Sequence, residues 1–146
     1  MPRLLLVHHT PSPVMQAVLE AAREGVAMVE EVELVVRPAL SAGAADVLAA
    51  DGILLGTPAN IGYMSGALKH FFDTVYYPCL DATVGLPYGV YVHGNDDTAG
   101  ALTAIGKITG ALRWKQVAAP LSLVGAPGPA ELDAVRELAA TVAVQL

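Results

Sequence analysis

Five short apolar runs, each too short for a stable helix, recur along the chain and are separated by segments with helical periodicity. The runs are Arg3–Val7, Val32–Arg37, Gly52–Gly56, Tyr88–His93 and Leu121–Val124. Strands that are apolar throughout are typical of a sheet covered on both faces, and strands that alternate with helices pair in parallel. The pattern therefore predicts an α/β chain with a parallel sheet between two layers of helices.

The segments between these runs carry helix signals of their own. Ser12 and Pro13 give an N-cap followed by proline at the first helical position, and Ser65 can cap a later helix. The expected helices are the one from Pro13, which fades between Gly25 and Val29, then Ala44–Ala50, Gly66 to about Val75, Ala101–Leu112 and Ala130–Val144. Five strand–helix units in 146 residues predict a single domain, residues 1–146, with a doubly wound sheet of order 2-1-3-4-5. A closed eight-unit barrel would need ~250 residues.

Composition and charge exclude several classes of protein. Hydrophobic residues make up 54% of the chain and charged residues 15%, which is unlike a disordered chain. No stretch reaches the ~18 consecutive apolar residues of a membrane span. The 14 acidic residues outnumber the 8 basic ones, so no basic face for nucleic acid is expected. The single cysteine, Cys79, rules out an internal disulfide, and with no signal-peptide pattern after Met1 we expect a cytoplasmic protein.

The loops that follow the strands hold most of the unusual chemistry. Ligands of doubly wound sheets bind at the carboxyl ends of the strands where the strand order reverses, here beside strands 1 and 3. The loops concerned are His8–Val14, Thr57–Ser65 and His93–Gly100. In the first loop, Thr10, Ser12 and the free N–H groups of the following helix predict an anion site. Capping of the helix by Ser12 alone would also explain this sequence.

The second loop is longer than an ordinary strand–helix connection. Gly62 and Gly66 allow a flat ring to approach the backbone, and Tyr63 and Met64 offer it apolar contact. The second loop therefore predicts a binding surface for a planar heterocycle.

The third loop offers hydrogen bonds to the edge of such a ring, from Asn95 and from the backbone around Gly94. Asp96 and Asp97 stand side by side with no third ligand at a suitable spacing, which is typical of a solvated turn. We therefore expect no metal site.

The segment from Gly56 to Asp73 resembles the flavodoxin-like superfamily, and most closely its NAD(P)H-dependent FMN reductase and quinone oxidoreductase branch, the tryptophan-repressor-binding-protein type. The matching pattern is G-[ST]-P-x-x-x-G-x-M-x-G-x-x-K-x-F-x-D. The residues that carry it are Gly56, Thr57, Pro58, Gly62, Met64, Gly66, Lys69, Phe71 and Asp73. The rest of the chain agrees with that branch in the order of its elements.

The resemblance implies a three-layer flavodoxin-like fold that binds FMN and passes electrons from NADH or NADPH to a quinone, a flavin or a similar small acceptor. It implies the FMN phosphate in the His9–Met15 loop and the isoalloxazine between Pro58–Met64 and His93–Asp97. The implied binding residues are His9, Thr10, Ser12, Val14, Met15, Pro58, Ala59, Asn60, Ile61, Gly62, Tyr63, Met64, His93, Gly94, Asn95 and Asp96. The first loop departs from the pattern of the superfamily, because Pro11 and Pro13 each remove a backbone N–H that a phosphate would use.

Two other functions fit the same fold. One is a flavodoxin-type carrier of single electrons, a class that is typically more acidic and flanks the flavin ring with aromatic side chains. The net charge of −6 and a second loop whose one aromatic residue is Tyr63 argue against this carrier. The other is a flavin-free binding module, although a phospho-receiver is excluded because His8, His9, Gly56 and Thr57 stand where its acids would be. A chain so poor in charge is expected to bury apolar surface between subunits, and we predict a homodimer.

Overall fold

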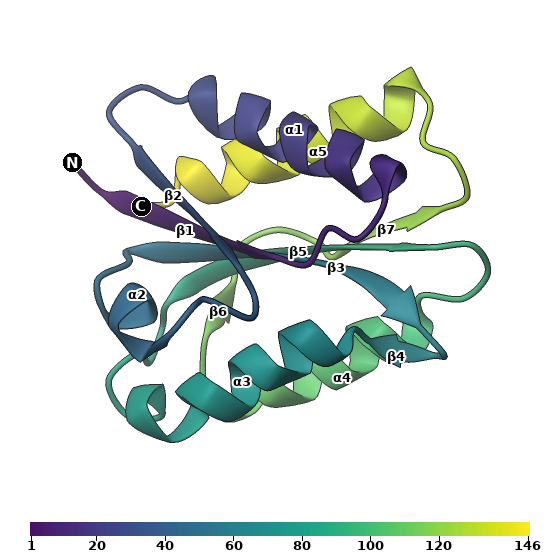
Figure 1. Cartoon of the computed structure of the whole chain (residues 1–146). Helices are drawn as coiled ribbons and strands as arrows, with labels where there is room; N and C mark the ends of the chain where they lie inside the picture. Colours follow the sequence, from purple (N-terminus) through teal and green to yellow (C-terminus); the bar gives the residue numbers. More distant parts are fainter.

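The computed structural model describes residues 1–146 and contains an open parallel sheet with helices on both faces (Figure 1). The strands are β1 (Arg3–His8), β2 (Glu33–Pro38), β3 (Gly52–Asn60), β4 (Tyr63–Met64), β5 (Pro87–Gly94), β6 (Lys115–Gln116) and β7 (Leu121–Val124). The helices are α1 (Pro13–Ala27), α2 (Ala44–Leu48), α3 (Gly66–Cys79), α4 (Ala99–Ala111) and α5 (Pro129–Ala143). No helix is both long and apolar enough to cross a membrane.

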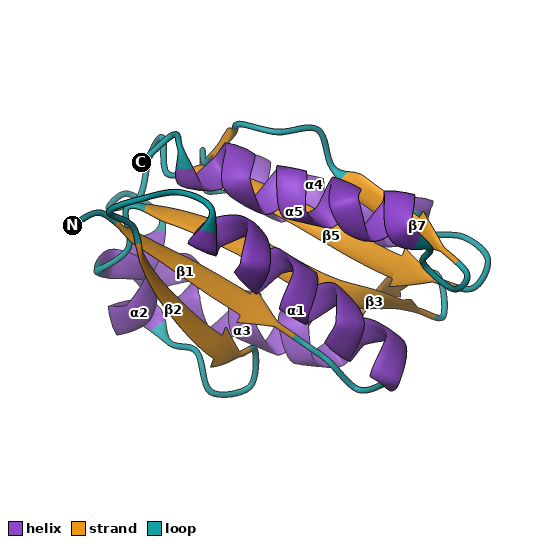
Figure 2. Ribbon diagram, turned by 90° about the horizontal axis from the view of Figure 1, so that it is seen from above, coloured by secondary structure: helices purple, strands orange, loops and turns teal.

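The order of the parallel strands is β2-β1-β3-β5, with β6 and β7 both paired to the outer edge of β5. The fifth strand is thus in two pieces, and the predicted order 2-1-3-4-5 is confirmed. The short β6 was not predicted, because two exposed residues carry no apolar pattern. Figure 2 shows α1 and α5 side by side over the sheet, while α2, α3 and α4 cover its other face.

Two buried clusters, one on each face of the sheet, hold these layers together. In β1, Leu4 and Leu6 belong to the cluster under α1 and α5, whereas Leu5 and Val7 belong to the cluster under α3 and α4. Successive side chains of a strand point to opposite faces, so a strand covered on both sides is apolar throughout. The expectation of buried strands is confirmed.

The predicted capping residues of α1 and α3 are confirmed, and α3 is longer than predicted. The hydroxyl of Ser12 accepts from the backbone N–H of Met15 at 3.2 Å, and that of Ser65 accepts from the N–H of Leu68 at 3.2 Å. Helix α3 continues beyond Val75, through Pro78, to Cys79. Cys79 is fully buried and extends the apolar stripe by one more turn, so its packing outweighs the hydrogen bond that Pro78 cannot make.

The segment Thr57–Ser65 is not an open loop, which corrects its prediction. Strand β3 runs on to Asn60 and turns back into β4, with Ala59 opposite Met64 and Asn60 opposite Tyr63. Ile61 and Gly62 form the turn with φ of 51° and 73°, the two positive values that a tight hairpin requires. The length of the segment is therefore that of a hairpin ordered by its own pairing.

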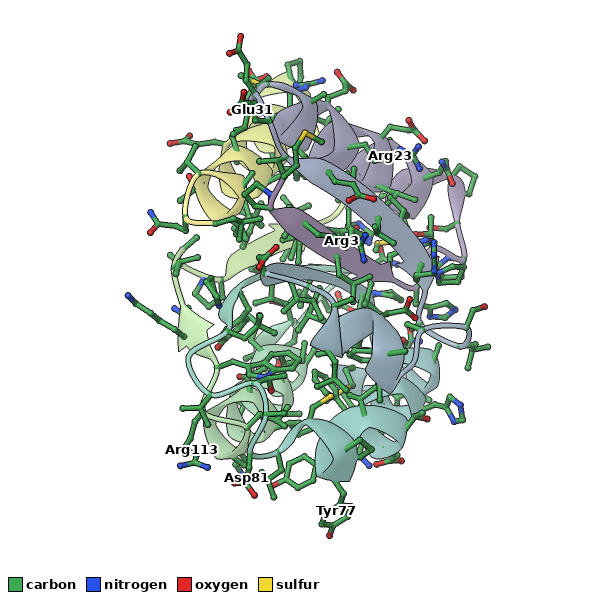
Figure 3. All side chains as sticks on the ribbon, turned by 90° about the vertical axis from the view of Figure 1, so that its left-hand side faces the viewer. Arg3, Arg23, Glu31, Tyr77, Asp81 and Arg113 are labelled. Carbon is green, nitrogen blue, oxygen red and sulfur yellow. The ribbon has the colours of Figure 1, made fainter.

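The amino ends of the strands carry exposed ion pairs (Figure 3). Arg3 pairs with Glu33 at 3.3 Å, and Arg113 pairs with Asp81 at 3.0 Å. Exposed pairs of this kind contribute little to stability. Arg3 and Glu33 line a hollow of about 250 Å³ together with residues of β2 and α2.

Candidate functional site

The three segments singled out in the sequence meet at the carboxyl edge of the sheet. Strand β3 lies between β1 and β5, with Gly56 paired to His8 on one side and Pro58 paired to His93 on the other. The β1–α1 loop, the β3–β4 hairpin and the β5–α4 loop consequently leave the sheet next to one another, as Figure 1 shows. This is the crevice where doubly wound sheets bind their ligands.

The β1–α1 loop presents the start of α1 to this crevice. Its two hydroxyls have partners within the loop: Ser12 accepts from the Met15 N–H, and Thr10 Oγ1 lies 2.8 Å from His8 Nδ1. The proton of the Ser12 hydroxyl is still free to be donated. Val14 is half-buried, and the Met15 side chain lies in the core under α1 and α5 and so does not line the crevice.

The fold lowers the pKa of one residue of this loop, His8. Burial, the neighbouring His9 and Arg23 together lower the pKa of His8 below its ordinary value of 6.5. Each of these causes disfavours a positive charge on the imidazole. His8 is therefore neutral at pH 7 and cannot serve there as a cation for an anionic group.

The hairpin exposes its tip and buries its base. Ile61 is 105% exposed and Tyr63 is 40% exposed, whereas Met64 is only 2% exposed and packs in the core under α3. The tip rests against α4, because a Cβ on Gly100 would overlap the carbonyl oxygen of Gly62. Gly100 was not among the predicted site residues, and its only signal is a glycine in the first turn of a helix.

A groove of about 290 Å³ separates the hairpin from the β5–α4 loop. It is lined by Ala59, Ile61, Gly62, Asn95, Asp96 and Asp97. Its hairpin wall is small and apolar, and its opposite wall carries an amide and two carboxylates. This combination fits a flat heterocycle with polar atoms along one edge.

A larger groove of about 550 Å³ lies on the other side of the hairpin, between α3 and α4. It is lined by Tyr63, Lys69, Ala99, Gly100, Thr103, Ala104, Lys107 and Ile108. Tyr63 therefore faces a different groove from Ile61. The ammonium of Lys69 is paired with Asp73, whereas Lys107 makes no ion pair.

The remaining predicted residues support the crevice from below. His93 is 8% exposed, and its Nε2 lies 2.8 Å from the carbonyl oxygen of Gly125, so this nitrogen donates. Pro58 and Gly94 are buried at the ends of their strands. Asn60 is exposed and holds the hairpin by pairing with Tyr63. No group of three His, Cys, Asp or Glu side chains comes together to hold a metal ion.

Two buried polar side-chain atoms lack a hydrogen-bond partner, and both lie near the β1–α1 loop. They are Nδ1 of His9 and the hydroxyl oxygen of Tyr91. Unpartnered buried polar atoms are uncommon in folded proteins and often mark a place for a ligand. Together with the groove beside the hairpin, they fit a ligand that has an anionic group at one end and a flat ring at the other, as FMN has.

Comparison with known proteins decides the family. The family model described as NADPH-dependent FMN reductase matches residues 27–126, which is more than half of the chain. The chain belongs to the NADPH-dependent FMN reductase family. The matched residues include the hairpin and both walls of its groove, whereas the β1–α1 loop precedes the matched region.

A curated relative from Aquifex aeolicus (strain VF5), described as a flavodoxin, is 33% identical over 75 residues. The match covers 51% of this chain and 40% of the Aquifex protein, so it spans less than half of that relative's length. This member of the FMN reductase family thus shares part of its sequence with a protein described as a flavodoxin.

Solved structures share the whole fold. A flavodoxin from the domain Archaea superposes with a TM-score of 0.84 at 16% identity, covering 98% of this chain and 97% of that one. A flavodoxin, WrbA-like protein from Agrobacterium tumefaciens superposes with a TM-score of 0.76 at 19% identity, covering 99% and 96%. The protein is a flavodoxin-fold member of a flavin-binding family, and the fold that the sequence resemblance implied is confirmed.

Proposed function

We propose that the protein binds FMN in the crevice at the carboxyl edge of the sheet and carries electrons between redox proteins, as a flavodoxin does. In this proposal the start of α1 holds the phosphate, and the groove between the hairpin and the β5–α4 loop holds the isoalloxazine. FMN supplies the redox chemistry when it is bound. The protein binds the cofactor, orients it and limits the access of water.

The hairpin wall of the groove shields the ring. Ala59 and Gly62 let the ring lie close to the backbone, and Ile61 places an aliphatic side chain beside it. The Asn95 side chain, in the opposite wall, can both donate and accept a hydrogen bond. These residues can fix the plane and the edge of the ring without acting as an acid or a base.

The acidic wall of the groove is the observation that carries the proposal of a carrier. Asp96 and Asp97 are exposed where the groove opens, on a chain with a net charge of −6. Carboxylates there repel the phosphates of NADH or NADPH and attract a basic protein surface. The two carboxylates therefore favour a protein partner at the flavin ring over NADH or NADPH. For that reason we propose the carrier first, and the reductase that the sequence resemblance implied is the second candidate.

The reductase function keeps support of its own. The matching family is described as NADPH-dependent, and the groove between α3 and α4 holds the unpaired cation Lys107 next to the hairpin. A dinucleotide phosphate would suit that cation. In this second candidate, NADH or NADPH reduces the flavin and a quinone or another small acceptor oxidises it.

The deciding experiment begins with purified protein loaded with FMN and kept free of oxygen. We expect reductive titration with dithionite to proceed in two resolved one-electron steps. We expect NADH or NADPH alone to leave the flavin absorption unchanged on the time scale of turnover. A basic electron-transfer protein should then oxidise the reduced protein rapidly.

Two other outcomes would overturn the proposal. Rapid bleaching of the flavin by NADPH would establish the reductase, and assays with quinones would follow. Failure to bind FMN at high micromolar concentration would remove both candidates and leave a flavin-free binding module. The expected homodimer stays a prediction, which sedimentation of the purified protein would test.

A further inference from the structure

Tyr91 carries a buried hydroxyl that no other group in the protein satisfies. The residue lies in the middle of β5, on the face covered by α1 and α5, and its exposed fraction is 0%. The hydroxyl oxygen has no hydrogen-bond partner. A tyrosine in an apolar core usually finds a partner for its hydroxyl, so this position calls for an explanation.

The ring of Tyr91 reaches from β5 across β3 toward β1. A Cβ on Gly56 would overlap the ring and the hydroxyl of Tyr91, so the glycine is what admits the ring. Gly56 pairs with His8, and its carbonyl oxygen accepts from the N–H of His9 at 2.9 Å. The hydroxyl therefore lies beneath the junction where β1 passes into the β1–α1 loop.

The loop above this hydroxyl is short of hydrogen-bond donors. Pro11 and Pro13 have no N–H, and the N–H of Met15 is already given to the Ser12 hydroxyl. Free donors remain in the amides of Thr10 and Ser12 and in the start of α1. A phosphate bound at this helix end would use further donors, and Tyr91 is the one that the core provides.

The Tyr91 hydroxyl is suited to donate and not to accept a proton. Burial raises the pKa of Tyr91 far above its ordinary value of 10.0. The hydroxyl is therefore protonated at neutral pH. Phosphate oxygens accept hydrogen bonds strongly, and they pair well with such a donor.

We propose that the Tyr91 hydroxyl is a phosphate-binding group: it donates a hydrogen bond to the terminal phosphate of FMN from beneath the β1–α1 loop. The assignment rests on the proposed binding of FMN and adds a specificity-determining residue to it. The hydroxyl is closed off from solvent, so the assignment requires the β1–α1 loop to move outward when the phosphate binds. His9, whose Nδ1 is also unpartnered, lies on the same loop.

The test is the substitution Tyr91→Phe, which removes one oxygen and keeps the ring over Gly56. The affinities for FMN and for riboflavin, which lacks the phosphate, are measured by quenching of flavin fluorescence. We expect FMN to bind about tenfold more weakly to the variant and riboflavin to bind as it does to the wild type. Because an unpartnered hydroxyl leaves the core, the thermal stability of the apoprotein should be unchanged or higher.

The matched control is Tyr88→Phe in the same strand. The Tyr88 hydroxyl faces the other layer of helices, where it accepts from Thr109 at 3.0 Å and lies 3.3 Å from Gln116 Oε1. Its removal should lower stability and leave the ratio of FMN to riboflavin affinity as it is in the wild type. A change of that ratio confined to Tyr91→Phe identifies a phosphate contact.

The wild-type protein gives a second readout that needs no variant to fold. With carbon-13 label at the ring carbon that bears the hydroxyl of each tyrosine, inorganic phosphate should shift the Tyr91 signal and leave the Tyr88 signal in place. An unchanged ratio in Tyr91→Phe, or a Tyr91 signal insensitive to both phosphate and FMN, would overturn the assignment while the wild type still binds FMN. Wild-type protein that binds neither flavin would instead overturn the proposed function.

Discussion

Ile61 combines two features that a β-branched apolar residue normally avoids. Its φ is 51°, in the left-handed region, and its side chain is 105% exposed at the tip of the β3–β4 hairpin. Backbone strain and exposed apolar surface at the same residue are typical of a functional position. The residue lines the groove proposed for the flavin ring. Contact with the ring explains why a strained and exposed isoleucine stands at this position.

The substitution Ile61→Asn should stabilise the apoprotein and weaken flavin binding. Asparagine tolerates the left-handed region, so we expect the free energy of unfolding to rise by about 1 kcal/mol. The loss of aliphatic contact should weaken FMN binding several-fold. Urea unfolding and fluorescence titration measure the two effects. Val84→Asn, which replaces a 55% exposed valine without a positive φ, is the control, and equal stabilisation in both variants would contradict the argument.

The lowered pKa of His8 predicts how the stability of the protein depends on pH. Its pKa is lowered in the folded protein, mainly by burial, so below its ordinary value of 6.5 the unfolded chain binds more protons than the folded one. The stability due to neutral His8 is therefore complete above pH 6.5 and is lost as the pH falls toward the folded pKa. In His8→Gln the decline in the free energy of unfolding between pH 7.5 and pH 5 should be smaller. The same decline in both proteins, followed by urea unfolding, would show that His8 is not its source.

At the scale of elements, the hairpin and α4 depend on a glycine contact. A Cβ on Gly100 would overlap the carbonyl oxygen of Gly62, so Gly100→Ala must push the hairpin away from α4. We expect a loss of about 1–3 kcal/mol in the free energy of unfolding and weaker FMN binding. Gly106→Ala in the same helix meets open space and should instead stabilise by about 0.5–1 kcal/mol. Chemical unfolding of both variants checks the pair, and a destabilised Gly106→Ala would mean that helix propensity does not explain the difference.

The elements that the sequence predicted are those whose signal is local. The buried strands and the caps Ser12 and Ser65 depend on neighbouring residues, and the structure agrees with these predictions. Trp114 is buried, and its indole N–H donates to the Thr83 hydroxyl at 2.8 Å. The β3–β4 hairpin was missed because its pairing is only two residues long and Ile61 is an unusual turn residue.

Contacts between distant segments could not be predicted from the pattern. Gly100 against Gly62, and Tyr91 across Gly56, depend on the strand order and on the register of β3 with β5. The sequence indicated which loops meet, because the carboxyl ends of parallel strands share an edge. It did not indicate that Met15 and Met64 turn inward, since an apolar residue at the end of a loop suits either the core or a ligand.

At the scale of the whole molecule, the acids at the mouth of the groove differ from many other acids in making no ion pair. Ion pairs such as Arg3 with Glu33 lie where the strands begin, whereas the unpaired acids Asp96 and Asp97 lie where the proposed flavin groove opens. A net charge of −6 adds a long-range attraction for basic partners. The orientation of such a partner should depend on the local acids and not on the net charge alone.

Neutralising the local acids should therefore slow electron transfer more than neutralising distant ones. The double variant Asp96→Asn with Asp97→Asn keeps the oxygen that accepts from the Ala99 N–H at 2.9 Å, and it removes two of the negative charges. With a strongly basic c-type cytochrome as acceptor, we expect the second-order rate at low salt to fall about 3- to 10-fold.

The control is Glu30→Gln with Glu137→Gln, which removes the same charge from exposed positions outside the groove. Its rate should fall by less than about twofold, since the added distance and the screening salt weaken the contribution of these charges. Stopped-flow traces from low to high ionic strength should bring all three proteins to a common rate, because salt screens the steering and leaves the flavin unchanged. Equal losses in both double variants would mean that net charge alone attracts the partner and that the groove does not orient it.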